Sequence, residues 1–115
     1  MKNPFKRQEI NPYSISDRVR FRNLDKTLDL NVRAAASTLV VGIRAANEKM
    51  VALRDDSPEK EKAEAAMEMA GNIFGKEQAS MLMEFYNGDS LAVVNACYLY
   101  FSTRLAKLIT KAQKK

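Results

Sequence analysis

Apolar residues recur every three or four positions along much of the chain, a spacing typical of one face of an α-helix. The first such series predicts a helix over about 29–54; its members are Leu28, Val32, Ala35, Leu39, Ile43, Ala46, Met50 and Leu53. Three further series predict helices over about 59–74, 77–86 and 90–112. The last series is wider than one helix face, which indicates either deep burial or a second contact surface.

Short turn signals separate the predicted helices. The segment DDSP at 55–58 offers capping side chains and a proline that suits the first helical position. Gly75 is suited to end the second helix in the left-handed conformation. Gly88 is the expected end of the third helix, and Asp89 is the predicted N-cap of the fourth.

Gly42 lies inside the first predicted helix. A glycine there lowers helix stability by about 1 kcal/mol relative to alanine. Two interpretations stay open: the glycine permits close approach of another helix, or it is simply tolerated.

An alternating pattern precedes the first helix. In RVRFR, residues 18–22, the two apolar residues fall on one side and the three arginines on the other, as in a half-buried strand. One short strand is not stable alone, so it needs a partner, either KTLDL at 26–30 or another subunit. Residues 1–16 are polar and contain two prolines, so we expect a flexible arm there.

These patterns predict an all-α fold. About four helices, in the order long, medium, short and long, form a single helical domain over 17–115 behind the arm. A short strand or hairpin near 18–30 is the one other element expected. The length of 115 residues, with 46% hydrophobic and 29% charged residues, is that of one globular domain rather than a disordered chain.

The side chains that carry most enzyme chemistry are scarce. The chain has no histidine, so the commonest general base and metal ligand is missing. Cys97 lies on the apolar series of the last helix, where a buried thiol is expected rather than a nucleophile. We therefore expect a non-enzymatic protein that uses no cofactor and no metal.

The sequence also predicts where the protein works. A single cysteine excludes an intramolecular disulfide. The N-terminal basic residues are not followed by the apolar stretch of a signal peptide, and no apolar run approaches the roughly 18 residues that span a bilayer. These observations predict a cytoplasmic protein with no membrane partner.

The net charge of +5 is concentrated at the two ends of the chain. Residues 91–115 contain five Lys or Arg and no Asp or Glu. A basic end can contact nucleic acid or an acidic partner, although it also serves solubility. If nucleic acid is the partner, phosphate contacts are expected from Arg18, Arg20, Arg22, Lys111, Lys114 and Lys115.

Methionines cluster in the second and third predicted helices. At these spacings Met67 and Met83 fit core positions. Met69 and Met81 fall off the main apolar series, so we expect them on an exposed apolar surface that adapts to a partner.

Residues 73–101 read IFGKEQASMLMEFYNGDSLAVVNACYLYF. A helix that ends in FG is followed by a short helix with spaced Leu and aromatic residues, then a GD turn and a long final helix; the residues are Phe74, Gly75, Leu82, Phe85, Tyr86, Gly88 and Asp89. Over about 28–112 this order resembles the small tail assembly chaperones of long-tailed bacteriophages, especially those of Gram-positive hosts. The basic C-terminal helix is a departure, since many such proteins are acidic.

The resemblance implies that the chain coats the helical tape measure protein in the host cytoplasm until tail tube subunits displace it. A groove between the second, third and fourth helices would receive apolar residues of this client. The predicted lining residues are Met69, Met81, Phe85, Tyr86 and Tyr100. In the competing interpretation the same residues fill a monomer core or a homo-oligomer interface. A further alternative is a structural tail or connector component whose arm reaches a neighbour.

Overall fold

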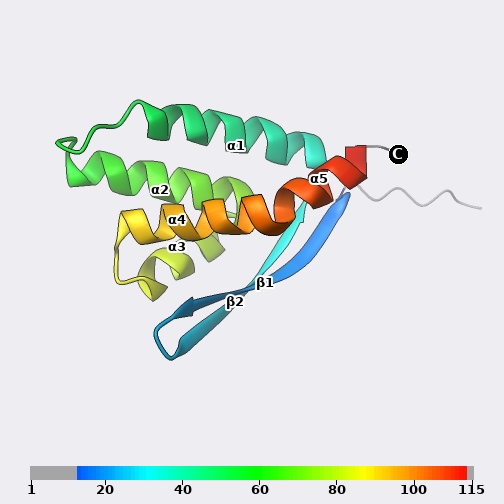
Figure 1. Cartoon of the computed structure of the whole chain (residues 1–115), viewed down its shortest axis with the longest axis horizontal. Coiled ribbons are helices and arrows are strands. Elements are labelled where there is room, and N and C mark those ends of the chain that lie inside the picture. The colour runs from blue at the N-terminus through cyan, green and yellow to red at the C-terminus, as the bar shows by residue number, and fades with distance from the viewer. Residues whose placement is uncertain (1–12, 114–115) are drawn as a thin grey trace, which may run out of the picture.

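The computed structural model describes residues 13–113. Most of the predicted arm, as well as Lys114 and Lys115, lies outside this part of the chain. In chain order the elements are β1 (Ile15–Asn23), β2 (Lys26–Ala34), α1 (Ala36–Val51), α2 (Glu59–Phe74), α3 (Lys76–Phe85), α4 (Ser90–Tyr100), a π-helical turn η1 (Phe101–Leu105) and α5 (Ala106–Gln113). Figure 1 shows α1, α2 and α4 side by side, with the β-hairpin crossing one end of the helices.

The predicted helical character is confirmed, but the hairpin is a larger element than expected. β1 begins at Ile15, inside the predicted arm, and pairs in antiparallel register with β2 along nine residues on each strand. The predicted partner segment at 26–30 is therefore confirmed. The predicted start of the first helix near residue 29 is wrong, because 29–34 belong to β2 and α1 begins at Ala36.

Side chains of the hairpin alternate between an inner face against the helices and an outer face in solvent. Leu30 and Val32 are fully buried on the inner face, next to Phe21 of β1. Arg18, Arg20 and Arg22 are exposed on the outer face. The alternation has the period of two that distinguishes a strand from a helix.

The core lies where the hairpin meets α2 and α4. Phe21 packs edge-on against Phe74 of α2, with 5.5 Å between ring centroids. Phe74 in turn stacks on Tyr100 of α4 at 5.8 Å. The three rings join the hairpin, α2 and α4 through contacts that bury large apolar areas.

Glycines and Asp89 define the helix boundaries largely as predicted. Gly75 has φ 90° and Gly88 has φ 76°, and such positive φ values strain other residues. Gly75 combines this φ with ψ 158°, which is extended rather than the left-handed helical conformation expected. Asp89 caps α4, since its Oδ1 accepts a hydrogen bond of 3.1 Å from the N–H of Ala92. α2 begins after Pro58 without a side-chain cap, in contrast to the prediction.

The predicted last helix is interrupted by η1. Val94 is buried beside Val93, and the buried positions Val93, Cys97, Tyr100, Leu105 and Ile109 are spaced by four, three, five and four residues. A π-helical turn, with its i→i+5 hydrogen bonding, accommodates the step of five and keeps both flanking segments against the core. No helix within residues 13–113 has both the length and the apolar character needed to cross a membrane.

Gly42 marks the closest approach of α1 and α2. Its carbonyl accepts a hydrogen bond of 2.9 Å from Asn72 Nδ2. A Cβ at position 42 would lie 3.0 Å from both Cβ and Cγ of Asn72, tighter than ordinary packing allows. The interpretation of close helix approach is therefore supported.

We predict that Gly42→Ala lowers the free energy of unfolding by about 1 kcal/mol, because overpacking of about 2 kcal/mol outweighs the gain of about 1 kcal/mol in helix propensity. Gly71→Ala is the matched control, since open space surrounds the point in α2 where the new methyl group would lie. The free energy of unfolding of this variant should rise by about 0.5–1 kcal/mol. Urea denaturation measures both changes. An equal increase in the free energy of unfolding for the two variants would show that the Asn72 side chain moves aside without an energetic cost.

Candidate functional site

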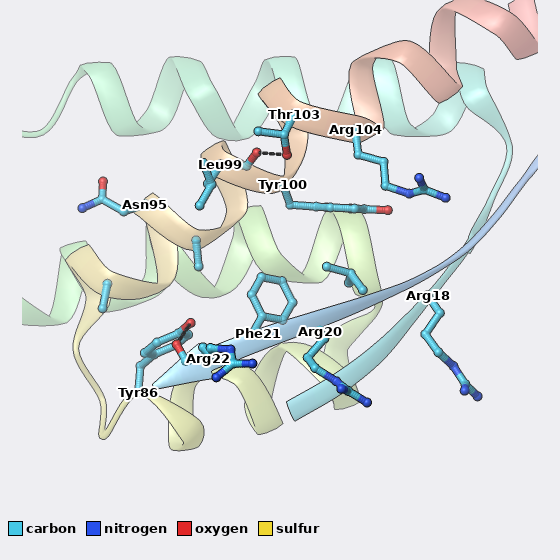
Figure 2. Close-up of a pocket in the computed structure, with 13 residues that line it drawn as sticks. Arg18, Arg20, Phe21, Arg22, Tyr86, Asn95, Leu99, Tyr100, Thr103 and Arg104 are labelled. Carbon is cyan, nitrogen blue, oxygen red and sulfur yellow. Dashed lines mark hydrogen bonds between the residues drawn. The ribbon is translucent and has the colours of Figure 1, made fainter. Parts of the chain in front are cut away.

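A groove with a volume of about 690 Å³ lies between β1 and the α4–η1 segment. Residues 18–22 form one wall, and the other includes Ala92, Ala96 and Leu99 of α4. Tyr86 and Arg104 lie toward opposite ends of the groove in Figure 2. Leu99 is 65% exposed although it belongs to a helix whose opposite side is in the core.

The structure unites residues that the sequence assigned to two different hypotheses. Tyr86 and Tyr100, predicted for an apolar protein-binding groove, line the same groove as Arg18, Arg20 and Arg22, predicted for nucleic acid. The groove therefore has apolar and aromatic surface on the helical side and positive charge along the strand (Figure 2).

Three other predicted groove residues lie elsewhere. Met69 is 2% exposed and belongs to the core, so its predicted exposure is wrong. It belongs to the buried face of α2 with Ala65, Ala66, Ala70, Ile73 and Phe74, a series at ordinary helical spacing. Met81 is 44% exposed on α3, as expected, but does not line this groove. Phe85 is half-buried and packs edge-on against Tyr86 at 5.0 Å.

The position of the predicted groove also needs correction. Leu82 of α3 and Val93 and Cys97 of α4 are buried in one continuous core with residues of α2. The space between α2, α3 and α4 is thus filled by side chains. The hairpin, which was not expected to pack on α4, provides the second wall of the groove instead.

A carboxylate fixes the hairpin to the far end of the groove. The Asp17 side chain is only 7% exposed, and its two oxygens accept hydrogen bonds of 2.7 Å from Nε and Nη2 of Arg104. Tyr100 Oη donates a third hydrogen bond of 2.7 Å to Asp17. Tyr100 and Arg104 are four residues apart, so α4 and η1 present both to one side.

Titration of these groups reflects the same contacts. The hydrogen bonds from Arg104 hold the pKa of Asp17 below its usual 3.8, against the opposing effect of burial, and Tyr100 and the backbone N–H of Arg18 lower it further. Burial, followed by the hydrogen bond to Asp17, raises the pKa of Tyr100. Asp17 is therefore a charged acceptor and Tyr100 a neutral donor at neutral pH.

One edge of β1 has backbone N–H and C=O groups that point toward the groove and not toward β2. Gln78 of α3 binds both backbone groups of Asn31 in β2, accepting from its N–H at 2.9 Å and donating to its C=O at 2.7 Å, so neither group points to β1. Arg18 lies opposite Asn31 in the register. Along an antiparallel ladder, pairs of residues that bond to each other through the backbone alternate with pairs whose backbone groups point outward. Arg18 and Asn31 form an outward-pointing pair, so the N–H and C=O of Arg18, Arg20 and Arg22 all point away from β2.

Some of these outward-pointing groups have partners. Tyr86 Oη donates a hydrogen bond of 2.8 Å to the C=O of Arg22, and the N–H of Arg18 lies against Asp17. Among the described residues, nothing in the protein bonds to the N–H and C=O of Arg20, the C=O of Arg18 or the N–H of Arg22. The edge is thus open around Arg20.

The arginines differ in their ion pairs. Arg20 binds Asp29 of β2 through two hydrogen bonds, of 2.8 and 3.2 Å, and both side chains are exposed. Arg18 and Arg22 have no ion-pair partner among residues 13–113. Lys111 of α5 lies near Ser16 at the start of β1 and does not line the groove.

Leu99 and Arg104 are not among the predicted site residues. Leu99 falls off the core stripe of its helix, which is a signal in the sequence that it is available for contact. Arg104 carries no such signal, because its pairing with Asp17 joins residues 87 positions apart.

The described residues offer little for covalent or metal chemistry. Burial raises the pKa of the Cys97 thiol to about 12, which is opposite to the shift that activates a nucleophile. Within residues 13–113 no cluster of three or more Cys, Asp or Glu residues is placed to hold a metal ion. The groove instead combines open backbone groups with apolar side chains, a combination that suits a polypeptide.

No family model, curated protein or solved structure matches the chain.

We predict that Asp17→Asn lowers the free energy of unfolding at pH 7 by about 2 kcal/mol, because charge-assisted hydrogen bonds to Arg104 are lost. The folded-state pKa of Asp17 is lowered, so its contribution is present above 3.8 and is lost as pH falls through the lowered pKa. Urea denaturation from pH 7 down to about pH 2 should therefore show the variant and the parent converging in acid.

Asp29→Asn is the matched control for this measurement, since Asp29 also pairs with an arginine but lies in solvent. Its effect at pH 7 should be much smaller than that of Asp17→Asn. Equal effects of the two variants would mean that the burial of Asp17 has no energetic importance.

We also predict alternating amide exchange along β1. The N–H groups of Val19 and Phe21 face β2 and should exchange at least about tenfold more slowly than those of Arg20 and Arg22. Hydrogen exchange followed by NMR measures each amide. In β2, the variant Gln78→Ala should speed exchange at the Asn31 amide and at no other central residue. Equal protection of all amides along β1 would contradict the open edge.

Proposed function

We propose that the chain is a non-enzymatic protein-binding module that acts as a tail assembly chaperone of a long-tailed bacteriophage. Its client would be the tape measure protein, held until tail tube subunits replace it. The resemblance of residues 28–112 to these chaperones supports this proposal, and so does a groove suited to a polypeptide.

The observation that carries the proposal is the exposure of Leu99 within the groove. A leucine that is 65% exposed beside Tyr86 and Tyr100 offers apolar surface that a partner can cover. Burial of such a side chain contributes about 1.5–3 kcal/mol to binding.

Nucleic-acid binding is the second candidate function. Its support is the exposure of Arg18, Arg20 and Arg22 on one face of the hairpin, with Lys111 near the start of β1. Asp29 lies in the middle of this face and neutralises Arg20, which weakens the case for phosphate contacts. Binding of this kind would fall steeply with added salt.

We predict that Leu99→Gln weakens binding of the co-expressed tape measure protein at least about tenfold, because the apolar contact is replaced by a polar one. Leu91→Gln is the matched control, since Leu91 lies on the same helix, is 68% exposed and does not line the groove. Co-purification from cells that carry the neighbouring genes, at about 0.1 and 1 M salt, measures the effect.

Retention of the tape measure protein at high salt by the parent and by Leu91→Gln, with loss in Leu99→Gln, would support the chaperone function. Recovery of nucleic acid alone, released by salt and reduced when Arg18 and Arg22 are replaced by Ala, would support the second candidate and contradict the first.

A further inference from the structure

The open edge of β1 is the strongest feature that the groove alone does not explain. Proteins usually cover the edges of a sheet or block them, since an uncovered edge pairs with other chains. Here Gln78 blocks β2 at Asn31, whereas β1 is open around Arg20 on the side where the groove lies.

We infer that the groove binds an extended segment, with alternating acidic and apolar residues, as a third strand beside β1. The inference rests on the proposed function in that the segment belongs to the client. It adds the conformation and the chemical pattern that the groove selects.

The backbone contribution centres on Arg20. Its N–H and C=O point the same way, so they can form a pair of hydrogen bonds with one residue of an incoming strand. The C=O of Arg18 and the N–H of Arg22 extend the ladder on either side. Strand addition of this kind derives affinity from the main chain and specificity from alternate side chains.

Charge sets one half of the sequence pattern. Alternate side chains of the third strand would lie beside those of Arg18, Arg20 and Arg22 on the outer face of the hairpin. Opposite charges at neighbouring positions on adjacent strands stabilise the pairing. Of these three arginines, only Arg20 forms an ion pair among the described residues, and the groove itself is lined by no Asp or Glu. Acidic residues are therefore favoured on this face.

The helical wall sets the other half. The intervening side chains of the third strand would point to the inner side, toward Ala92, Ala96 and Leu99. The two alanines are small and leave depth between β1 and α4, and Leu99 offers an exposed apolar contact. Apolar residues are therefore favoured at these positions.

A second copy of the chain fits the edge less well. Pairing β1 with the β1 of another copy would place one column of arginines beside another. Like charges at adjacent positions destabilise a strand pair. A partner with the opposite charge is the better occupant.

The test uses synthetic peptides of about six residues that alternate Glu and Val, added to the full-length protein and followed by NMR and calorimetry. We expect binding in the groove, with slowed exchange of the Arg20 and Arg22 amides. A peptide that alternates Lys and Val should bind at least about tenfold more weakly.

N-methylated peptides then test the strand geometry. In a strand only every second amide faces β1, so methylation of either the Glu amides or the Val amides should weaken binding at least about tenfold, while methylation of the other set should not. Sensitivity of the Glu set indicates antiparallel addition, and sensitivity of the Val set indicates parallel addition. Equal tolerance of both modifications, or no binding of the parent peptide, would overturn the inference.

The outcomes separate this inference from the proposed function. If the peptides fail but the tape measure protein still binds and depends on Leu99, strand addition is wrong and the chaperone function stands. If the tape measure protein does not bind either, the proposed function fails with it. Binding of a nucleic acid in place of the peptides would likewise overturn the inference.

Discussion

The placement of the hairpin depends on the burial of one carboxylate. Asp17 is nearly inaccessible on the inner face of β1, and a charge in that position is costly unless hydrogen bonds replace its water. Arg104 and Tyr100 provide them. Because these three bonds are directional, they fix the position of Asp17 in β1 relative to Tyr100 and Arg104, in addition to the apolar packing of Phe21, Leu30 and Val32.

The π-helical turn makes this arrangement possible. Tyr100 precedes the turn and Arg104 lies within it, and Leu105 returns to the core directly afterwards. A regular α-helix would place the residue five positions after Tyr100 away from the core. The local irregularity thus keeps the last helix packed on both sides of the position where it binds Asp17, and the edge of β1 is left facing α4.

Much of the helical part could be predicted from the sequence because its signals are local. Gly88 and Asp89 specify the turn before α4 by their own conformation and hydrogen bonding. β2 was harder to identify, since Leu28 and Val32 fit both the strand period and the helix period. Tyr86 and Tyr100 were predicted as groove residues, but the position of the groove could not be predicted, because Arg20 and Leu99 line the same groove only through the tertiary packing of the hairpin.

Gln78 has a further consequence for how the protein behaves at high concentration. Its side-chain amide donates and accepts as a strand residue would, so it occupies the outward-pointing backbone groups of Asn31 without adding another strand. Edge-to-edge fibres need two open edges on every subunit, one for each neighbour. A second copy that approaches the centre of β2 meets the Gln78 side chain where it needs the two backbone groups of Asn31. Edge-to-edge stacking of copies through this part of β2 is therefore disfavoured, whereas the edge of β1 around Arg20 stays accessible to a partner.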